Sequence, residues 1–88
     1  MPVVDNVNQY PVVDKYWVLV KRTLREVFQE KTDSADTLRK EVSQRLADEQ
    51  LQFYHAEPLD VAADLTGKRP DKSQVKEYRK LADQCDWR

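Results

Sequence analysis

The residue types best suited to catalysis or metal binding are scarce in this chain. The single histidine, His55, is followed closely in sequence by three carboxylates, Glu57, Asp60 and Asp64. Zinc sites usually draw on several histidine or cysteine ligands at short spacings, which this segment does not provide. The His-Ala-Glu sequence that begins at His55 matches the start of the zinc-deaminase signature, but the Pro-Cys-x-x-Cys that must accompany it is absent. We therefore predict no metal site.

A cysteine nucleophile is the next candidate, because a thiol can be activated by a neighbouring imidazole. Nothing in the spacing places the single cysteine, Cys85, beside His55. Cys85 lies on the apolar stripe of a predicted helix, where an unpaired cysteine acts as a small buried hydrophobe. Gly67 is the only glycine, so glycine-rich phosphate loops are excluded. We expect a non-enzymatic protein with no cofactor and no small-molecule substrate.

The composition is that of a small helical domain. Of the 88 residues, 40% are hydrophobic and 35% are charged, which is too charged for a membrane protein and too apolar for a disordered chain. One glycine is too few for a fold built from many tight hairpins. The predicted fold class is all-α, with a single domain of about four helices over residues 14–88. An extended arm, rich in proline and paired valines, is predicted over residues 1–13.

The first helix is predicted from about residue 15 to residue 31, with Asp14 as its N-cap. Its apolar residues cover roughly 120° of a helical wheel. They are Tyr16, Trp17, Val20, Leu24, Val27 and Phe28. Val18 and Leu19 fall outside this stripe, so we expect them to face the arm or a partner.

A second helix is predicted from about residue 35 to residue 50 or beyond. Its apolar stripe is narrow, as in a coiled-coil seam, and consists of Ala35, Leu38, Val42 and Leu46. This pattern places the helix on the outside of the bundle or across a dimer interface. Residues 51–56 fit two interpretations. They continue the helix, which we favour because Phe53 extends its stripe, or they form a short strand that pairs with the valine-rich arm.

Two short helices are predicted to follow. Pro58 suits the first turn of the third helix, and Gly67 suits the left-handed position just after its end. Asp71 caps the fourth helix, and Gln74 stands three residues later, as in a capping box. The apolar spacing of three and four residues predicts that the fourth helix ends near Cys85.

These two helices and their turn are similar to the helix-turn-helix motif of DNA-binding proteins. Ala63 stands four residues before Gly67, and in that motif a small residue lets the second helix approach the first while glycine makes the turn. Val75 and Tyr78 would be the buried positions of the second helix. The resemblance implies, as an alternative function, a nucleic-acid-binding regulator whose basic side chains contact phosphates. Those side chains are Lys68, Arg69, Lys72, Lys76, Arg79 and Lys80.

The leading prediction is a non-enzymatic interaction module that self-associates or docks onto a protein partner. Trp87 lies beyond the last predicted helix, where tryptophan is often a docking residue. Charge is unevenly distributed, with eight acidic and three basic side chains in residues 32–65, and four acidic and seven basic ones in residues 66–88. The residues expected to contact the partner are Val18, Leu19, Leu38, Val42 and Trp87.

Three features bear on the compartment. A single cysteine permits no intrachain disulfide, and no apolar run approaches the roughly 20 residues of a membrane span. The first ten residues lack the basic start and apolar core of a secretory signal. We therefore expect a cytoplasmic protein with no membrane partner.

Overall fold

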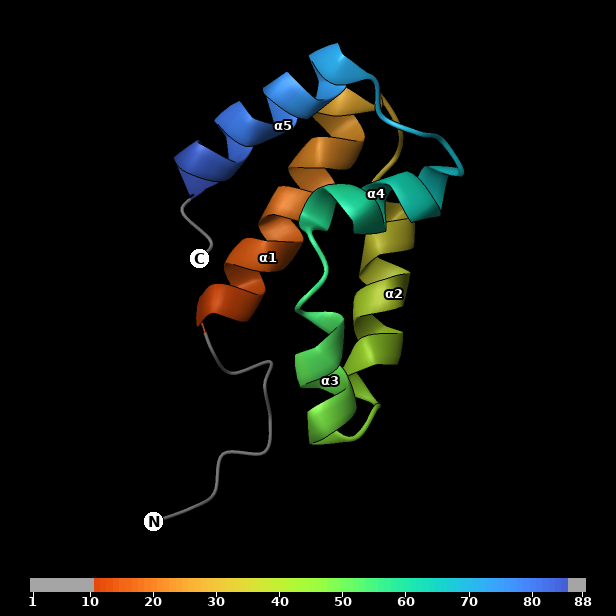
Figure 1. Ribbon diagram of the computed structural model, residues 1–88. Coiled ribbons are helices and arrows are strands. Elements are labelled where there is room, and N and C mark those ends of the chain that lie inside the picture. Colours follow the sequence, from red (N-terminus) through yellow and green to blue (C-terminus); the bar gives the residue numbers. More distant parts are fainter. Residues whose placement is uncertain (1–10, 86–88) are drawn as a thin grey trace.

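The computed structural model describes residues 11–85, and this part of the chain is helical without a β-strand (Figure 1). In chain order its elements are α1 (Pro11–Arg22), a π-helical turn η2 (Thr23–Val27), α2 (Asp33–Ser43), α3 (Ala47–Phe53), α4 (Pro58–Thr66) and α5 (Lys72–Cys85). The all-α prediction is confirmed. There are five α-helices where about four were predicted, because the second predicted helix is divided into α2 and α3.

The first helix begins earlier than the sequence predicted. Pro11, the first described residue, already belongs to α1. The predicted extended arm is therefore wrong for its last three residues, and residues 1–10 lie outside the described part of the chain. Asp14 lies inside the first turn and is not an N-cap. Burial of Val13 in the core outweighs the weaker helix preference of a β-branched residue.

The second predicted helix breaks in its middle. The backbone of Leu46 is extended, with φ −62° and ψ 154°, and α3 starts at the next residue. The amide of the buried Gln50 stabilises this turn by donating to the carbonyl oxygens of Arg45 at 2.8 Å and Ser43 at 3.4 Å. The segment that also fitted a short strand is helical up to Phe53, as we favoured.

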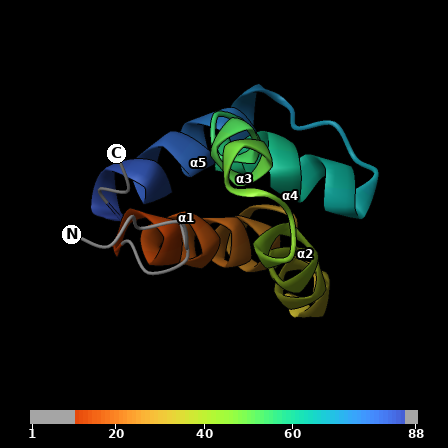
Figure 2. The same ribbon diagram turned by 90° about the horizontal axis from the view of Figure 1, so that it is seen from below.

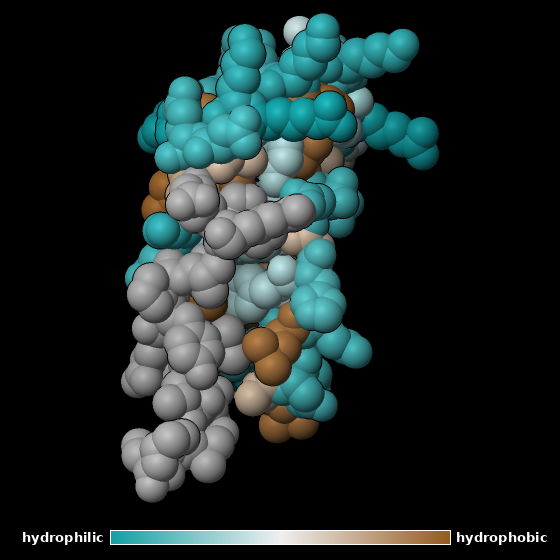
Figure 3. All heavy atoms as spheres, turned by 60° about the vertical axis from the view of Figure 1, so that its left-hand side comes forward, coloured by the Kyte–Doolittle hydropathy of each residue, from teal (hydrophilic) through white to brown (hydrophobic). Residues whose placement is uncertain are grey.

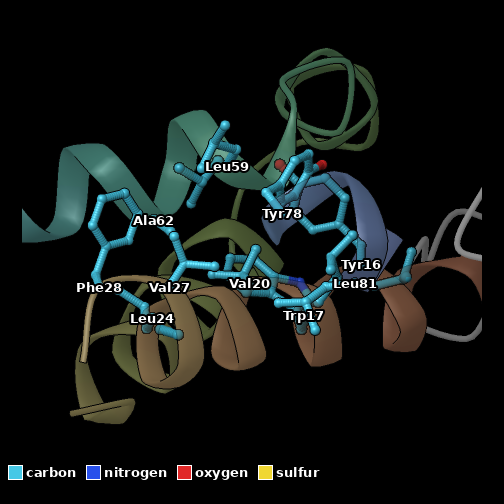
Figure 4. Close-up of a cluster of buried hydrophobic side chains, with 14 of the residues drawn as sticks. Tyr16, Trp17, Val20, Leu24, Val27, Phe28, Leu59, Ala62, Tyr78 and Leu81 are labelled. Atoms are coloured by element: carbon cyan, nitrogen blue, oxygen red, sulfur yellow. The ribbon is translucent and has the colours of Figure 1, made fainter. Parts of the chain in front are cut away.

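The segment formed by α1 and η2 is the central element of the fold. Helices α4 and α5 pack against it and form a layer above α1 in the view of Figure 2, while α2 packs beside it. Burying large apolar side chains contributes about 1.5–3 kcal/mol each, so this shared core is the main source of stability. Figure 4 shows much of it. The largest buried side chains include Tyr16, Trp17, Val20, Leu24, Val27, Phe28, Val42, Leu59, Tyr78 and Leu81.

An aromatic cluster attaches α3 to α1. The rings of Trp17 and Phe53 are stacked, with their centroids 5.7 Å apart. The indole Nε1 of Trp17 donates to the hydroxyl of Tyr54 at 2.8 Å, and the hydroxyl of Tyr16 donates to the carbonyl oxygen of Ala56 at 3.0 Å. Tyrosine and tryptophan are suited to such a position because each has an apolar ring and a polar group that needs a partner when it is buried. The break between α2 and α3 allows these contacts.

The predicted signals for the last two helices are confirmed. Pro58 occupies the first turn of α4, and Gly67 follows its end with φ 68°. The backbone N–H of Gln74 donates to the carboxylate of Asp71 at 2.8 Å, while the N–H of Asp71 donates to the side-chain oxygen of Gln74 at 3.0 Å. This reciprocal pair is a capping box. Helix α5 extends to Cys85, the last described residue.

The turn η2 widens the first helix where α4 and α5 meet it. The backbone N–H of Phe28 donates to the carbonyl oxygen of Thr23, five residues back, at 3.1 Å. The buried hydroxyl of Thr23 donates to the carbonyl oxygen of Leu19 at 2.7 Å, so no polar group of this side chain is left unpaired. Gln29 follows with φ 56°, a left-handed conformation that glycine adopts more readily than other residues.

Gln29 and Gly67 offer a matched pair of substitutions at left-handed positions. Gln29→Gly should raise the free energy of unfolding by about 1 kcal/mol, because relief of backbone strain exceeds the entropic cost of glycine. Gly67→Ala should lower it by about 1 kcal/mol, and this effect is purely conformational because nothing lies within 4 Å of the added methyl group. Urea denaturation measures both. A less stable Gln29→Gly variant or a more stable Gly67→Ala variant would contradict these backbone assignments.

One buried tyrosine, Tyr16, and one half-buried tyrosine, Tyr54, couple stability to alkaline pH. Burial raises the pKa of the Tyr16 hydroxyl, and the nearby Tyr54 and Asp60 raise it further. Burial also raises the pKa of Tyr54, against the lowering effect of the hydrogen bond from Trp17. The native state therefore retains these protons at a pH where tyrosines of the unfolded chain, with pKa values near 10, release them. This stabilisation is complete below about pH 10 and is lost as the pH rises through the native pKa values.

The free energy of unfolding should therefore fall between about pH 9 and pH 11, and it should fall less steeply in Tyr16→Phe. Lysines also titrate in this range, so the informative quantity is the difference between the two slopes. Urea denaturation at several pH values measures both proteins. Identical slopes would mean that the Tyr16 hydroxyl titrates alike in the folded and unfolded chain.

Candidate interaction surfaces

His55 and Cys85, the residues first considered for chemistry, belong to different parts of the fold. Within residues 11–85, no three histidine, cysteine, aspartate or glutamate side chains are grouped so that they could hold a metal ion. His55 is exposed just after α3. Cys85 is half-buried at the end of α5, where its sulfur accepts a hydrogen bond from the guanidinium of Arg22 at 3.7 Å. None of the described helices has the length and apolar character needed to span a membrane.

Two of the predicted partner-binding residues belong to the core. Leu19 and Val42 have no exposed surface, and Leu38 is half-buried against the same core. The prediction that Leu19 is exposed is wrong, because α1 is covered from several sides and its buried face is wider than the main stripe. The placement of the second helix outside the bundle is also wrong at Val42. Trp87 lies outside the described residues.

Substitutions at Val42 in α2 and at Leu46, at the break after α2, should distinguish a core position from a surface position. Val42→Ala should lower the free energy of unfolding by about 2 kcal/mol, because it deletes two fully buried methyl groups and leaves a cavity. Leu46→Ala should change it by less than about 0.5 kcal/mol, since this side chain is 70% exposed. Chemical denaturation checks both values. Equal losses in the two variants would show that the exposure of Leu46 in the structure is wrong.

Within residues 13–85, the exposed large apolar side chains lie in two places. Leu46 and Leu51, at the break before α3 and within α3, are 70% and 52% exposed. They stand beside two carboxylates in the first turn of that helix, Asp48 and Glu49. We call these four residues the α3 corner. Apolar atoms come to the surface at the lower end of the molecule in Figure 3, where α2 and α3 meet. The sequence analysis placed Leu46 on a helix stripe and did not single out Leu51.

Val18 is the second exposed apolar side chain, at 50% exposure on α1, and this exposure agrees with the prediction. On a helix, residues three, four and seven positions away share its face. These neighbours are Asp14, Lys15, Lys21, Arg22 and Arg25. Some of the charges are paired: Lys21 with Asp36 at 2.5 Å, and Asp14 with Arg39 at 2.6 Å. The Val18 face, defined as Val18 and these five neighbours, has a net positive charge.

The solvent face of α5 is strongly basic. Lys72, Lys76, Arg79 and Lys80 fall within about 100° of a helical wheel, and all four are exposed. None of the four is in an ion pair within residues 11–85. We call these four residues the α5 basic face. Hydrophilic side chains cover the upper end of the molecule, where α5 lies (Figure 3).

The other two predicted basic residues lie in the turn before α5. Lys68 is paired with the carboxylate of Glu30 at 2.7 Å, whereas Arg69 is exposed and in no described ion pair. The predicted buried positions of the second helix are supported at Tyr78, which is buried, and in part at Val75, which is half-buried. The structure thus brings most of the predicted basic residues to one side of one helix.

No family model, curated protein or solved structure matches this chain in comparisons with known proteins. The α3 corner, the Val18 face and the α5 basic face are therefore the features of the molecule from which a function can be inferred. The α5 basic face has no exposed large apolar residue, while the other two surfaces combine apolar side chains with charge.

Proposed function

We propose that this domain is a non-enzymatic interaction module and that its partner is a second copy of the chain. The observation that supports this proposal is the exposure of Leu46 and Leu51, five residues apart, while most other large aliphatic side chains of the described chain are buried. Removing a leucine side chain fully from water is worth about 1.5–3 kcal/mol. Covering both leucines would supply the apolar centre of a small interface.

Charge favours the Val18 face of another copy as the surface that covers this corner. The corner presents the carboxylates of Asp48 and Glu49, and Val18 is surrounded by more basic than acidic side chains. Opposite charges around an apolar contact set its orientation and suppress wrong pairings, although they add little affinity of their own. Lys21 and Arg22 have carboxylate partners at 2.5 and 2.8 Å, whereas Arg25 is 65% exposed and lies 3.9 Å from Glu26, so Arg25 is the cation chosen to test this face.

A twofold axis would let each copy give its α3 corner to the partner and receive the partner's corner on its own Val18. Such an isologous arrangement forms the contact twice and closes, so association stops at the dimer. The apolar area involved is small, and association also costs several kcal/mol of rigid-body freedom. We therefore expect a weak dimer, with a dissociation constant of about 10 μM or higher.

Sedimentation velocity on the full chain over a hundredfold range of concentration tests this assignment. The wild-type protein should shift from monomer to dimer, and Leu46→Ser combined with Leu51→Ser should remain a monomer with an unchanged circular dichroism spectrum. The control is Thr37→Ala, an exposed change on the outer side of α2, which should dimerise like wild type. A wild-type chain that is a monomer throughout would refute self-association.

A charge exchange makes the test specific for the pairing. Glu49→Arg and Arg25→Glu should each weaken dimerisation because each places like charges across the contact. A mixture of the two variants should associate more strongly than either alone, because both contacts of the mixed dimer again join opposite charges, one in the native order and one exchanged. If mixing gives no gain, the α3 corner does not meet the Val18 face.

A further inference from the structure

We infer that the α5 basic face binds the phosphate backbone of nucleic acid, independently of any self-association. The face consists of Lys72, Lys76, Arg79 and Lys80 on one helix of 14 residues. Four exposed cations within about 100° of one helix, none of them neutralised by an ion pair in the described chain, repel one another and favour an anionic partner. The structure of the free domain gives none of these four side chains an ion-pair partner among the described residues.

Helix α5 holds these side chains in a fixed array. Its opposite face buries Tyr78 and Leu81 in the core, and the hydroxyl of Tyr78 donates to the carboxylate of Glu57 at 2.8 Å. The capping box formed by Asp71 and Gln74 fixes the start of the helix. A second bond, from the amide of Gln74 to the carbonyl oxygen of Val27 at 3.3 Å, ties this end to η2. The basic face therefore needs no reordering of backbone to meet a ligand.

The dimensions of the array match a duplex. From Lys72 to Lys80 the helix rises about 12 Å, since each residue adds about 1.5 Å. Duplex DNA carries one charge per roughly 1.7 Å of its axis, so several phosphates lie along a length of this size. Each long and flexible basic side chain can therefore reach a phosphate. Arg69, exposed in the turn just before the helix, extends the same array by one cation.

The other side chains on the solvent face of α5 argue against an acidic protein as the partner. Interfaces between proteins have an apolar or aromatic centre and are depleted of lysine. The solvent face of α5 has no exposed large apolar residue, and the other exposed side chains on it are Ser73, Glu77, Asp83 and Gln84. Phosphate backbones are recognised by this set of lysine, arginine and serine side chains without an apolar centre.

One carboxylate limits the predicted affinity. Asp83 stands three, four and seven residues after Lys80, Arg79 and Lys76, so it shares the face of all three on the helix. Its negative charge lies where a phosphate would approach. Removing this charge should therefore strengthen binding, a result that general loss of structure cannot produce.

Fluorescence anisotropy with a labelled mixed-sequence duplex of about 20 base pairs tests the inference on the full chain. Four phosphate contacts predict an affinity about a hundredfold lower at 200 mM than at 50 mM salt, because each contact releases counterions. The double variant Lys76→Gln and Lys80→Gln should bind more weakly at the lower salt. It should also lower the slope of log affinity against log salt by about two. Asp83→Asn should bind several-fold more tightly.

The matched control changes two lysines elsewhere. Lys31→Gln combined with Lys40→Gln alters the net charge equally at exposed positions outside α5, and it should leave affinity and salt slope near wild type. No change of anisotropy at low salt would overturn the inference. Equal weakening by the control pair would show attraction to overall charge and would also overturn it. Competition by polyglutamate as effective as by unlabelled duplex would instead indicate an acidic protein partner.

Discussion

Trp17 and the residues around it on α1 form the surface against which the other helices bury their apolar faces. Helices α2, α4 and α5 each pack against the α1–η2 segment, and α3 reaches α1 through the stacked ring of Phe53. A chain of 88 residues can bury only a modest core. Because several helices pack against one central helix, the same apolar residues of that helix take part in several contacts. The π-helical turn η2 serves the same arrangement, because it widens the central helix where α4 and α5 pack against it.

This arrangement determines which residues are free to meet other molecules. Because α1 is covered on several sides, Leu19 lies in the core and Val18, its neighbour in sequence, faces water. The apolar residues of α2 are also used internally, as the full burial of Val42 shows. What remains outside is a small apolar corner at the start of α3 and a basic face on α5. The two proposals concern these surfaces and Val18, because the core leaves no other large apolar side chain exposed in the described chain.

Sequence signals predicted the parts of the fold that depend on interactions between nearby residues. Proline in the first turn of α4, the left-handed Gly67 and the reciprocal bonds of Asp71 and Gln74 depend on a few adjacent residues, and the structure has them where the sequence placed them. The break before α3 could not be predicted in this way. It depends on Gln50, whose amide pairs with carbonyl groups five and seven residues away, and on aromatic contacts across more than thirty residues.

The candidate surfaces were predicted unevenly for a related reason. A helical wheel indicates which side of one helix is apolar, so the basic side of α5 could be identified from its spacing. It does not indicate how many neighbours cover that helix, which is why Leu19 and Val42 were placed at the surface. Leu51 offered no periodic signal, because its exposure follows from the turn at Leu46 and not from the pattern within α3.

The central position of α1 also affects how the chain folds as it is synthesised. Helix α1 leaves the ribosome first, whereas Tyr78 and Leu81, which cover part of it, are among the last described residues to follow. At about 5–20 residues per second, the intervening sixty or so residues take roughly 3–12 seconds. During that time the apolar face of α1 has no native cover on the side of α5.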